Sequence, residues 1–161
     1  MLEASYLVFL LRPHHVSFNK RLVKMPKLYL YDAGLVSWLL GLRSAEQLET
    51  HPLRGNIFET FVMAELMKAR LNRGERPNLH FWRDSNGNEV DVIVEQGTRL
   101  MPLEIKSGRT VTLDSFVGLE KLSTLAGDVA LTPTLVHGGE ESFQHKGVRV
   151  VGWRECGDLN V

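Results

Sequence analysis

The chain has 161 residues, of which 43% are hydrophobic and 24% charged, and its basic and acidic residues balance to a formal net charge of zero. This length is enough for one domain with a hydrophobic core, and a zero net charge argues against strong autonomous binding of nucleic acid. The only cysteine, Cys156, excludes an internal disulfide framework and a cysteine-rich zinc site.

No apolar run approaches the roughly 20 residues that a membrane-spanning helix needs, so we expect no membrane span. The lone cysteine fits a reducing compartment, and we predict a cytoplasmic location. The sequence contains no G-x-x-x-x-G-K-[ST] motif, so we expect no nucleotide site in this chain.

Residues 1–50 differ in pattern from the rest and are predicted to form an N-terminal extension. Strands are expected at residues 6–11 and 27–31, followed by a short helix at 33–40 that Gly41 ends. Because the chain begins almost directly in a strand, we expect this extension to be the end of a preceding module of a longer protein.

The segment between these two strands is basic, with no acidic residue from position 12 to position 31. A solvated loop is one interpretation. The other is a surface that follows DNA phosphates and is therefore sensitive to salt. The candidate nucleic-acid-binding residues are Arg12, Lys20, Arg21 and Lys24.

Residues 51–161 have a regular pattern that predicts one α/β domain. A largely buried helix is expected at 56–71, because its apolar residues cover most of its circumference. A meander of three strands follows, with a strand at 79–83 and an Asn86-Gly87 turn. A helix at 113–125 and strands at 134–137 and 148–153 complete the domain. A helix between two strands implies a right-handed crossover, so the sheet should be mixed.

Residues 89–106 predict a hairpin whose two strands are joined by a tight turn at Gln96-Gly97. With that two-residue loop, Asp91 would lie opposite Pro102. Side chains alternate along a strand, so Asp91 is expected on the opposite face from its valine neighbours, Val90, Val92 and Val94.

The same alternation places Glu104 and Lys106 on one face, and the predicted register adds Asp91 to that face. The backbones of Asp91 and Glu104 would then be roughly 7–8 Å apart. Two carboxylates at this spacing can reach one Mg²⁺ ion at Mg–O distances of about 2.0–2.1 Å. A plain polar face with a surface salt bridge, worth only ~0–1 kcal/mol, is the alternative.

Each group has a role in hydrolysis of a phosphodiester. Asp91 and Glu104 would hold Mg²⁺, or Mn²⁺, through oxygen ligands, and the ion would polarise the scissile phosphate and acidify a bound water. Lys106 would position the attacking water or help to deprotonate it, and would offset charge that develops on phosphate.

The helix at 56–71 offers a further carboxylate, and two residues compete for this role. Glu59 lies in the first turn, where it would also favour the helix N-terminus by about 0.3–1 kcal/mol. Glu65 lies roughly 240° away around the helix, so both cannot face one ion. A buried Glu65 would need a partner, and Lys68 is the candidate.

These motifs together resemble a known family. The segments Gly55-x-x-Phe58-Glu59, Glu89-Val90-Asp91 and Glu104-Ile105-Lys106-Ser107-Gly108 are similar to the PD-(D/E)XK nuclease-like domain. The narrower similarity is to the uncharacterised domain at the C-terminus of many prokaryotic AAA+ superfamily ATPase-like proteins. The segments at residues 27–35 and 81–84 also resemble that group, so the resemblance covers nearly the whole chain.

The resemblance implies a restriction-endonuclease-like core, made of a helix, a three-strand meander, a helix and a strand. It implies metal-ligand roles for Asp91 and Glu104, a catalytic role for Lys106 and an accessory acidic role for Glu59. It also implies an N-terminal ATPase module that is absent from this chain.

Two functional hypotheses follow. The first is a Mg²⁺-dependent nuclease-like domain that binds or cleaves DNA. The second is a non-catalytic docking or nucleic-acid-sensing module of the ATPase, since a nuclease-like fold does not by itself establish nuclease activity. The sequence does not distinguish a monomer from an oligomer.

Overall fold

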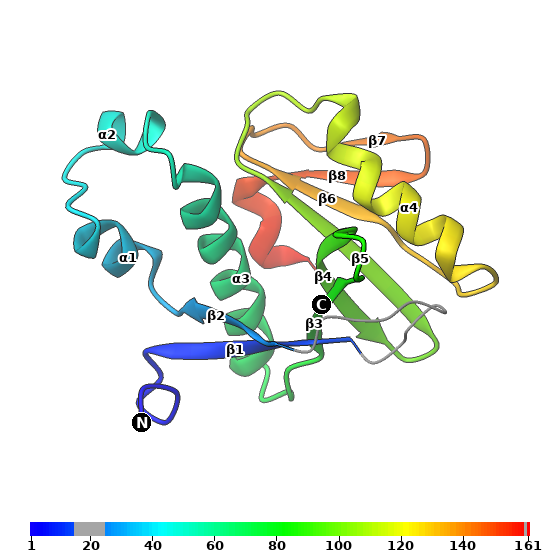
Figure 1. Ribbon diagram of the computed structural model, residues 1–161, viewed down its shortest axis with the longest axis horizontal. Coiled ribbons are helices and arrows are strands. Elements are labelled where there is room, and N and C mark those ends of the chain that lie inside the picture. Colours follow the sequence, from blue (N-terminus) through cyan, green and yellow to red (C-terminus); the bar gives the residue numbers. More distant parts are fainter. Residues whose placement is uncertain (15–24, 160) are drawn as a thin grey trace.

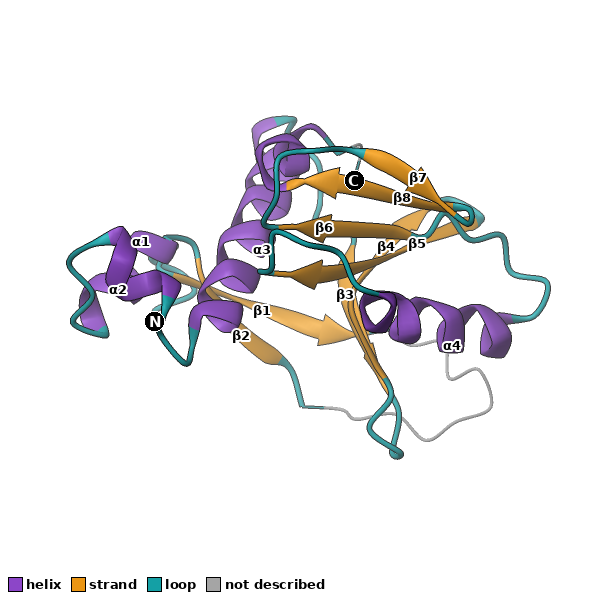
Figure 2. Ribbon diagram, turned by 90° about the horizontal axis from the view of Figure 1, so that it is seen from above, coloured by secondary structure: helices purple, strands orange, loops and turns teal. Residues whose placement is uncertain are grey.

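One eight-stranded mixed sheet organises the protein, with strand order β2-β1-β3-β4-β5-β6-β8-β7. The computed structural model describes residues 1–14, 25–159 and 161. Helix α3 (Arg54–Asn72) packs on one face of the sheet and α4 (Val117–Ala126) on the other (Figure 1). Seen from above, the sheet separates the two helices (Figure 2). The mixed α/β fold agrees with the expectation from sequence.

The N-terminal strands are part of this same sheet. Strand β1 (Val8–Pro13) runs antiparallel to β2 (Lys27–Leu30) and parallel to β3 (Leu79–Arg83). Helix α1 (Ala33–Leu39) follows, and its N-terminus is capped by Asp32, whose Oδ1 accepts from the backbone N–H groups of residues 34 and 35. The pairing of β1 with β3 is what brings β2 next to the centre of the domain.

The rest of the sheet follows the predicted order. Strands β3, β4 (Glu89–Gln96) and β5 (Arg99–Lys106) form an antiparallel meander, and β6 (Thr134–His137) pairs parallel with β5. The helix between β5 and β6 allows this parallel pairing, as expected. The remaining elements are α2 (Ala45–Glu49), β7 (Phe143–His145), β8 (Val148–Gly152) and the 3₁₀ turns η1 (Leu113–Phe116) and η2 (Trp153–Asp158).

Two hydrophobic clusters hold the layers together. The larger lies between α3 and the sheet and includes Val62, Leu66, Phe81 and Val92; the smaller lies under α4 and includes Trp82 and Leu122. Six residues of α3 are buried, which agrees with the expected apolar helix. Within the described ranges, no helix combines the length and the apolar character that a membrane crossing requires.

The turn of the β4–β5 hairpin lies one residue later than predicted. Gln96 pairs with Arg99, so the two loop residues are Gly97 and Thr98, and the prediction of Gln96-Gly97 was wrong. Gly97 is the first loop residue and has a φ of 65°. A type II′ turn requires a positive φ at this position, and glycine adopts it without strain. The pairing therefore shifts by two residues, and its continuation sets Asp91 opposite Glu104 instead of Pro102.

The predicted alternation of faces along β4 was also wrong. Between two successive pairs with β3, His80–Ile93 and Trp82–Val90, β3 advances two residues and β4 advances three. One extra residue of β4, at Asp91–Val92, thus forms a β-bulge. Val90 consequently packs under α4, whereas Val92 and Val94 pack under α3. Bulges re-aim side chains and are common beside functional sites.

Candidate active site

Asp91 occupies the bulge, and its side chain bridges to the neighbouring strand. The last regular pair of β4 and β5 is Val92–Leu103; beyond it, Asp91 Oδ2 accepts a hydrogen bond of 2.8 Å from the backbone N–H of Ile105. Burial, followed by the charges of Glu104 and Glu59, raises the pKa of Asp91 to about 7. A carboxyl group with this pKa is readily converted between its protonated and charged forms near neutral pH.

Glu104 lies on β5 and is 7% exposed. Its Oε1 accepts a hydrogen bond of 2.6 Å from Lys106 Nζ, whereas its buried Oε2 has no hydrogen-bond partner among the described residues. Burial raises the pKa of Glu104, although the hydrogen bond and charge of Lys106 oppose that rise. A buried carboxylate oxygen without a partner is costly unless a proton or a cation neutralises it.

Lys106 is the amine of the predicted site, and its side chain is 40% exposed. Burial lowers the pKa of Lys106, but the hydrogen bond and charge of Glu104 outweigh burial, and the net pKa is raised. A lysine in this state keeps its proton at neutral pH. Its chemistry is therefore that of a fixed positive charge and hydrogen-bond donor, and the role of general base is disfavoured.

The helix carboxylate of the site is Glu59. Its Oε1 accepts a hydrogen bond of 2.5 Å from Tyr29 Oη, and its charge acts on both Asp91 and Glu104. Glu65 instead pairs with Lys68 at 2.8 Å, which is the partner that the sequence suggested for it. Of the two glutamates that the sequence left open, Glu59 is therefore the one that lies near Asp91 and Glu104.

Three residues of the site were not singled out from the sequence: Lys27, Tyr29 and Glu89. Lys27 Nζ lies 3.4 Å from Glu59 Oε1 and makes a second ion pair with Glu89 Oε1. Burial, with the charge and hydrogen bond of Glu59, raises the pKa of Tyr29. Lys27 and Tyr29 are two positions apart on one strand, and that spacing was the available signal. We call the four carboxylates of Glu59, Glu89, Asp91 and Glu104 the acidic cluster.

Helix α4 approaches the acidic cluster at Gly118. A Cβ atom at this position would lie 2.8 Å from the backbone oxygen of Glu89 and 3.0 Å from Glu104 Oε2. Glycine in a helix is less favourable than alanine by roughly 0.5–1 kcal/mol. Its presence here is explained by the close packing of the helix backbone on the Glu104 carboxylate.

The side chains satisfy part of what a metal site needs. Across the ranges the structure describes, no group of three or more His, Cys, Asp or Glu side chains is arranged to hold a metal ion. Mg²⁺, however, is commonly held by one or two carboxylates and completed by water. The Asp91–Glu104 pair, with its unpartnered oxygen and raised pKa values, fits a hard cation of this kind.

The predicted nucleic-acid-binding residues are described only in part. Arg12 is exposed on β1, whereas Lys20, Arg21 and Lys24 lie outside the described residues. Besides Lys27, two basic side chains border the acidic cluster: Lys106, and Arg83, whose Nε lies 3.5 Å from Glu89 Oε2.

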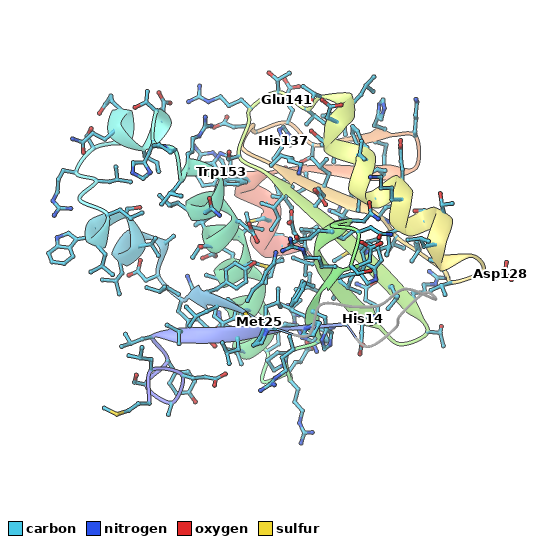
Figure 3. The ribbon with its side chains drawn as sticks, viewed as in Figure 1. His14, Met25, Asp128, His137, Glu141 and Trp153 are labelled. Atoms are coloured by element: carbon cyan, nitrogen blue, oxygen red, sulfur yellow. The ribbon has the colours of Figure 1, made fainter. Side chains whose placement is uncertain are left out.

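A separate cleft of about 800 Å³ lies beyond the ends of β6 and β8. His137, Glu141 and Trp153 lie close together at this end of the molecule (Figure 3). The His137 ring is held between the backbone oxygens of Arg109 and Glu141, at 3.2 and 2.8 Å. The residues that line this cleft do not include the acidic cluster.

Comparisons with known proteins place these residues within families of undefined activity. The model of the family described as "Domain of unknown function (DUF4143)" matches residues 54–156, which is more than half of the chain and includes Glu59, Asp91, Glu104 and Lys106. A second model, described as "Domain of unknown function (DUF8612)", matches residues 1–46, which include Lys27 and Tyr29.

Relatives and a solved structure are also similar. Uncharacterized proteins of Mycobacterium tuberculosis and Mycobacterium bovis are each 34% identical over 104 residues, which cover 64% of this chain and 22% of each relative. The chain thus matches about a fifth of the length of these relatives. A crystal structure of a Vibrio cholerae protein is 19% identical with a TM-score of 0.44, and the match covers 66% of this chain and 33% of that one.

Proposed function

The chain belongs to the family described as DUF4143, and we propose that it is a Mg²⁺-dependent nuclease-like domain of the PD-(D/E)XK type, which acts on DNA phosphodiesters. One observation carries the proposal. Asp91, Glu104 and Lys106 meet where β4 and β5 separate, and Glu104 leaves one buried carboxylate oxygen without a partner among the described residues. The core order of helix, three-strand meander, helix and strand supports the same type of domain.

Asp91 and Glu104 would hold the ion, and Mn²⁺ would serve in place of Mg²⁺. When bound, such an ion polarises a phosphate and lowers the pKa of a coordinated water. The hydrogen bond from the Ile105 N–H fixes the orientation of the Asp91 carboxylate. The ion pair with Lys106 likewise fixes Oε1 of Glu104 and leaves Oε2 for the cation.

Lys106 would act on the substrate directly. Its side chain is 40% exposed and keeps its proton, so it can donate to a phosphate oxygen and offset the charge that develops there. Glu59 is further from the reacting groups in this scheme. Fixed by the Tyr29 hydroxyl, it adds negative charge that favours binding of the cation.

The test is a cleavage assay with Mg²⁺ or Mn²⁺ on labelled branched, duplex and single-stranded DNA. Asp91→Ala and Lys106→Ala should each abolish cleavage, because the first removes a metal ligand and the second the phosphate-binding charge. Glu65→Ala is the matched control, since Glu65 pairs with Lys68 away from the acidic cluster. Cleavage that survives in both site variants would contradict the proposal.

A second candidate function is a non-catalytic docking or nucleic-acid-sensing module of a longer ATPase-like protein. It is favoured by the ion pairs of Lys27 with Glu59 and Glu89, which engage two of the four carboxylates of the acidic cluster without any metal ion. Zero net charge favours it too. Absence of both metal binding and cleavage, in this chain and in a longer form with the ATPase-like module, would support this function over the first.

A further inference from the structure

Lys27 is the basic residue that joins two members of the acidic cluster. It lies on β2, outside the residues matched by the DUF4143 model, and its Nζ contacts both Glu59 and Glu89. The ammonium also lies 5.4 Å from the centre of the Phe81 ring. The side chains of Lys27, Glu59 and Glu89 are 26%, 22% and 27% exposed, so these ion pairs are partly withdrawn from water.

The charges of the site are close to what one divalent cation would balance. Four carboxylates face two lysines, Lys27 and Lys106, and two formal negative charges remain. Arg83 contacts Glu89, at 3.5 Å, from a half-exposed position at the rim. Lys27 also interacts electrostatically with Asp91, in addition to its ion pairs with Glu59 and Glu89. The Lys27 ammonium therefore acts on one of the carboxylates that we assign as ligands of the cation.

We propose that the Lys27 ammonium is a built-in counter-ion of the acidic cluster, which competes electrostatically with the divalent cation and sets its affinity. This inference rests on the proposed function, because it assumes a cation at Asp91 and Glu104. In the chain as it stands, the single charge of Lys27 is shared between Glu59 and Glu89, offsets one of their two negative charges and repels a further cation. A residue of β2 therefore sets the cation affinity of a site whose ligands, Asp91 and Glu104, lie on β4 and β5.

A purely structural ion pair would behave differently. If Lys27 only fastened β2 to α3, its removal would loosen the packing around Glu59 and weaken cation binding together with stability. If it is a competing charge, its removal should strengthen cation binding while the protein without added cation loses stability. The two roles thus predict opposite signs for the change in affinity.

The experiment measures Mn²⁺ binding from the electron paramagnetic resonance signal of free Mn²⁺ during titration of the purified chain. The variants are Lys27→Met and Lys27→Gln, which replace the charged side chain with an apolar and a polar one. If one variant misfolds, the other still tests the proposal. Lys68→Met is the matched control, because it removes a lysine that pairs with a glutamate of the same helix. Asp91→Ala identifies the binding that belongs to the site.

Both Lys27 variants should bind Mn²⁺ about tenfold more tightly than the unchanged chain, given the strength of charge interactions in partly buried sites. Lys68→Met should leave the affinity within about twofold, since that exposed pair is screened. Unchanged or weaker binding in the Lys27 variants, with Asp91-dependent binding intact in the parent chain, would overturn this inference alone. Absence of Asp91-dependent binding in the parent and in both Lys27 variants would overturn the proposed function with it.

Discussion

The two halves of the acidic cluster are neutralised in different ways. In the paired half, Glu59 and Glu89 are held by a lysine and a tyrosine hydroxyl from β2. In the buried half, Asp91 and Glu104 have fewer partners, and burial raises the pKa of each. A bound cation stabilises a carboxylate most where that carboxylate has few other partners, and we therefore propose that the cation binds at the buried half. We propose that Lys27 on β2, which lies outside the residues matched by the DUF4143 model, tunes cation binding through its ion pairs with the paired half.

The largest expected effect comes from removal of a ligand in the buried half. Glu104→Ala should weaken Mn²⁺ binding by at least about 100-fold, because even loss of residues that only support ligands lowers affinity by roughly 10–100-fold. Glu65→Ala should leave it unchanged. Isothermal titration calorimetry of the two variants measures the difference. Equal affinities of the two variants would contradict the assignment of Glu104 as a ligand of the cation.

Filling the space at Gly118 should disturb the same half by a different route. Gly118→Ala would place a methyl group at 3.0 Å from Glu104 Oε2 and 2.8 Å from the Glu89 backbone oxygen. We expect about 1–3 kcal/mol of destabilisation, as for other overpacked positions, together with weaker Mn²⁺ binding.

Gly55→Ala is the matched control for stability, because a methyl group there would meet only Ser107 Oγ, at an ordinary contact distance of 4.0 Å. Urea unfolding measures the free energy of unfolding of both variants, which carry the same glycine-to-alanine substitution. Helix propensity alone predicts that Gly118→Ala gains stability. Such a gain would show that α4 is not packed closely against the Glu104 carboxylate.

Neutralising one carboxylate of the buried half should stabilise the protein in EDTA. Asp91→Asn keeps an oxygen that can accept from the Ile105 N–H and removes a charge that repels Glu104. We expect a rise in Tm of about 2–4 °C, which corresponds to about 1 kcal/mol for a chain of this size. Thermal melts in EDTA and in Mn²⁺ test this, and a lower Tm in EDTA would identify Asp91 as a structural ion-pair partner.

The pH dependence of stability tests the same carboxylate without a substitution. The pKa of Asp91 is raised from 3.8 to about 7, so between these values the folded chain holds a proton that the unfolded chain has lost. Raising the pH through this window in EDTA should therefore lower the free energy of unfolding. Urea midpoints at several pH values measure the slope. Asp91→Asn should flatten it, and a slope that is identical in the variant would contradict the assigned pKa.

The sequence predicted the elements of the core better than their exact pairing. Strands β3 and β6 have the predicted bounds, because each is a short apolar run between clear turn residues. The elements α2 and β7 were not predicted, since five and three residues are too few to show a period. The turn at Gly97-Thr98 was placed one residue early, because glycine can occupy either loop position.

The three residues that the sequence grouped on the β4–β5 hairpin do lie near one another, but their geometry was predicted only in part. Asp91, Glu104 and Lys106 do meet, but through a bulge and the separation of two strands and not through simple alternation. A bulge depends on the partner strand, so the period of one strand does not reveal it. Lys27 and Glu59 meet only because β1 pairs with β3, which is a contact between distant segments.

The most direct test of cation binding at Asp91 and Glu104 is a crystal of the chain soaked in Mn²⁺, with diffraction recorded at a wavelength where manganese scatters anomalously. We expect one anomalous peak between the carboxylates of Asp91 and Glu104, at coordination distance from both. A peak between Glu59 and Glu89 instead, or no peak at the acidic cluster, would contradict it.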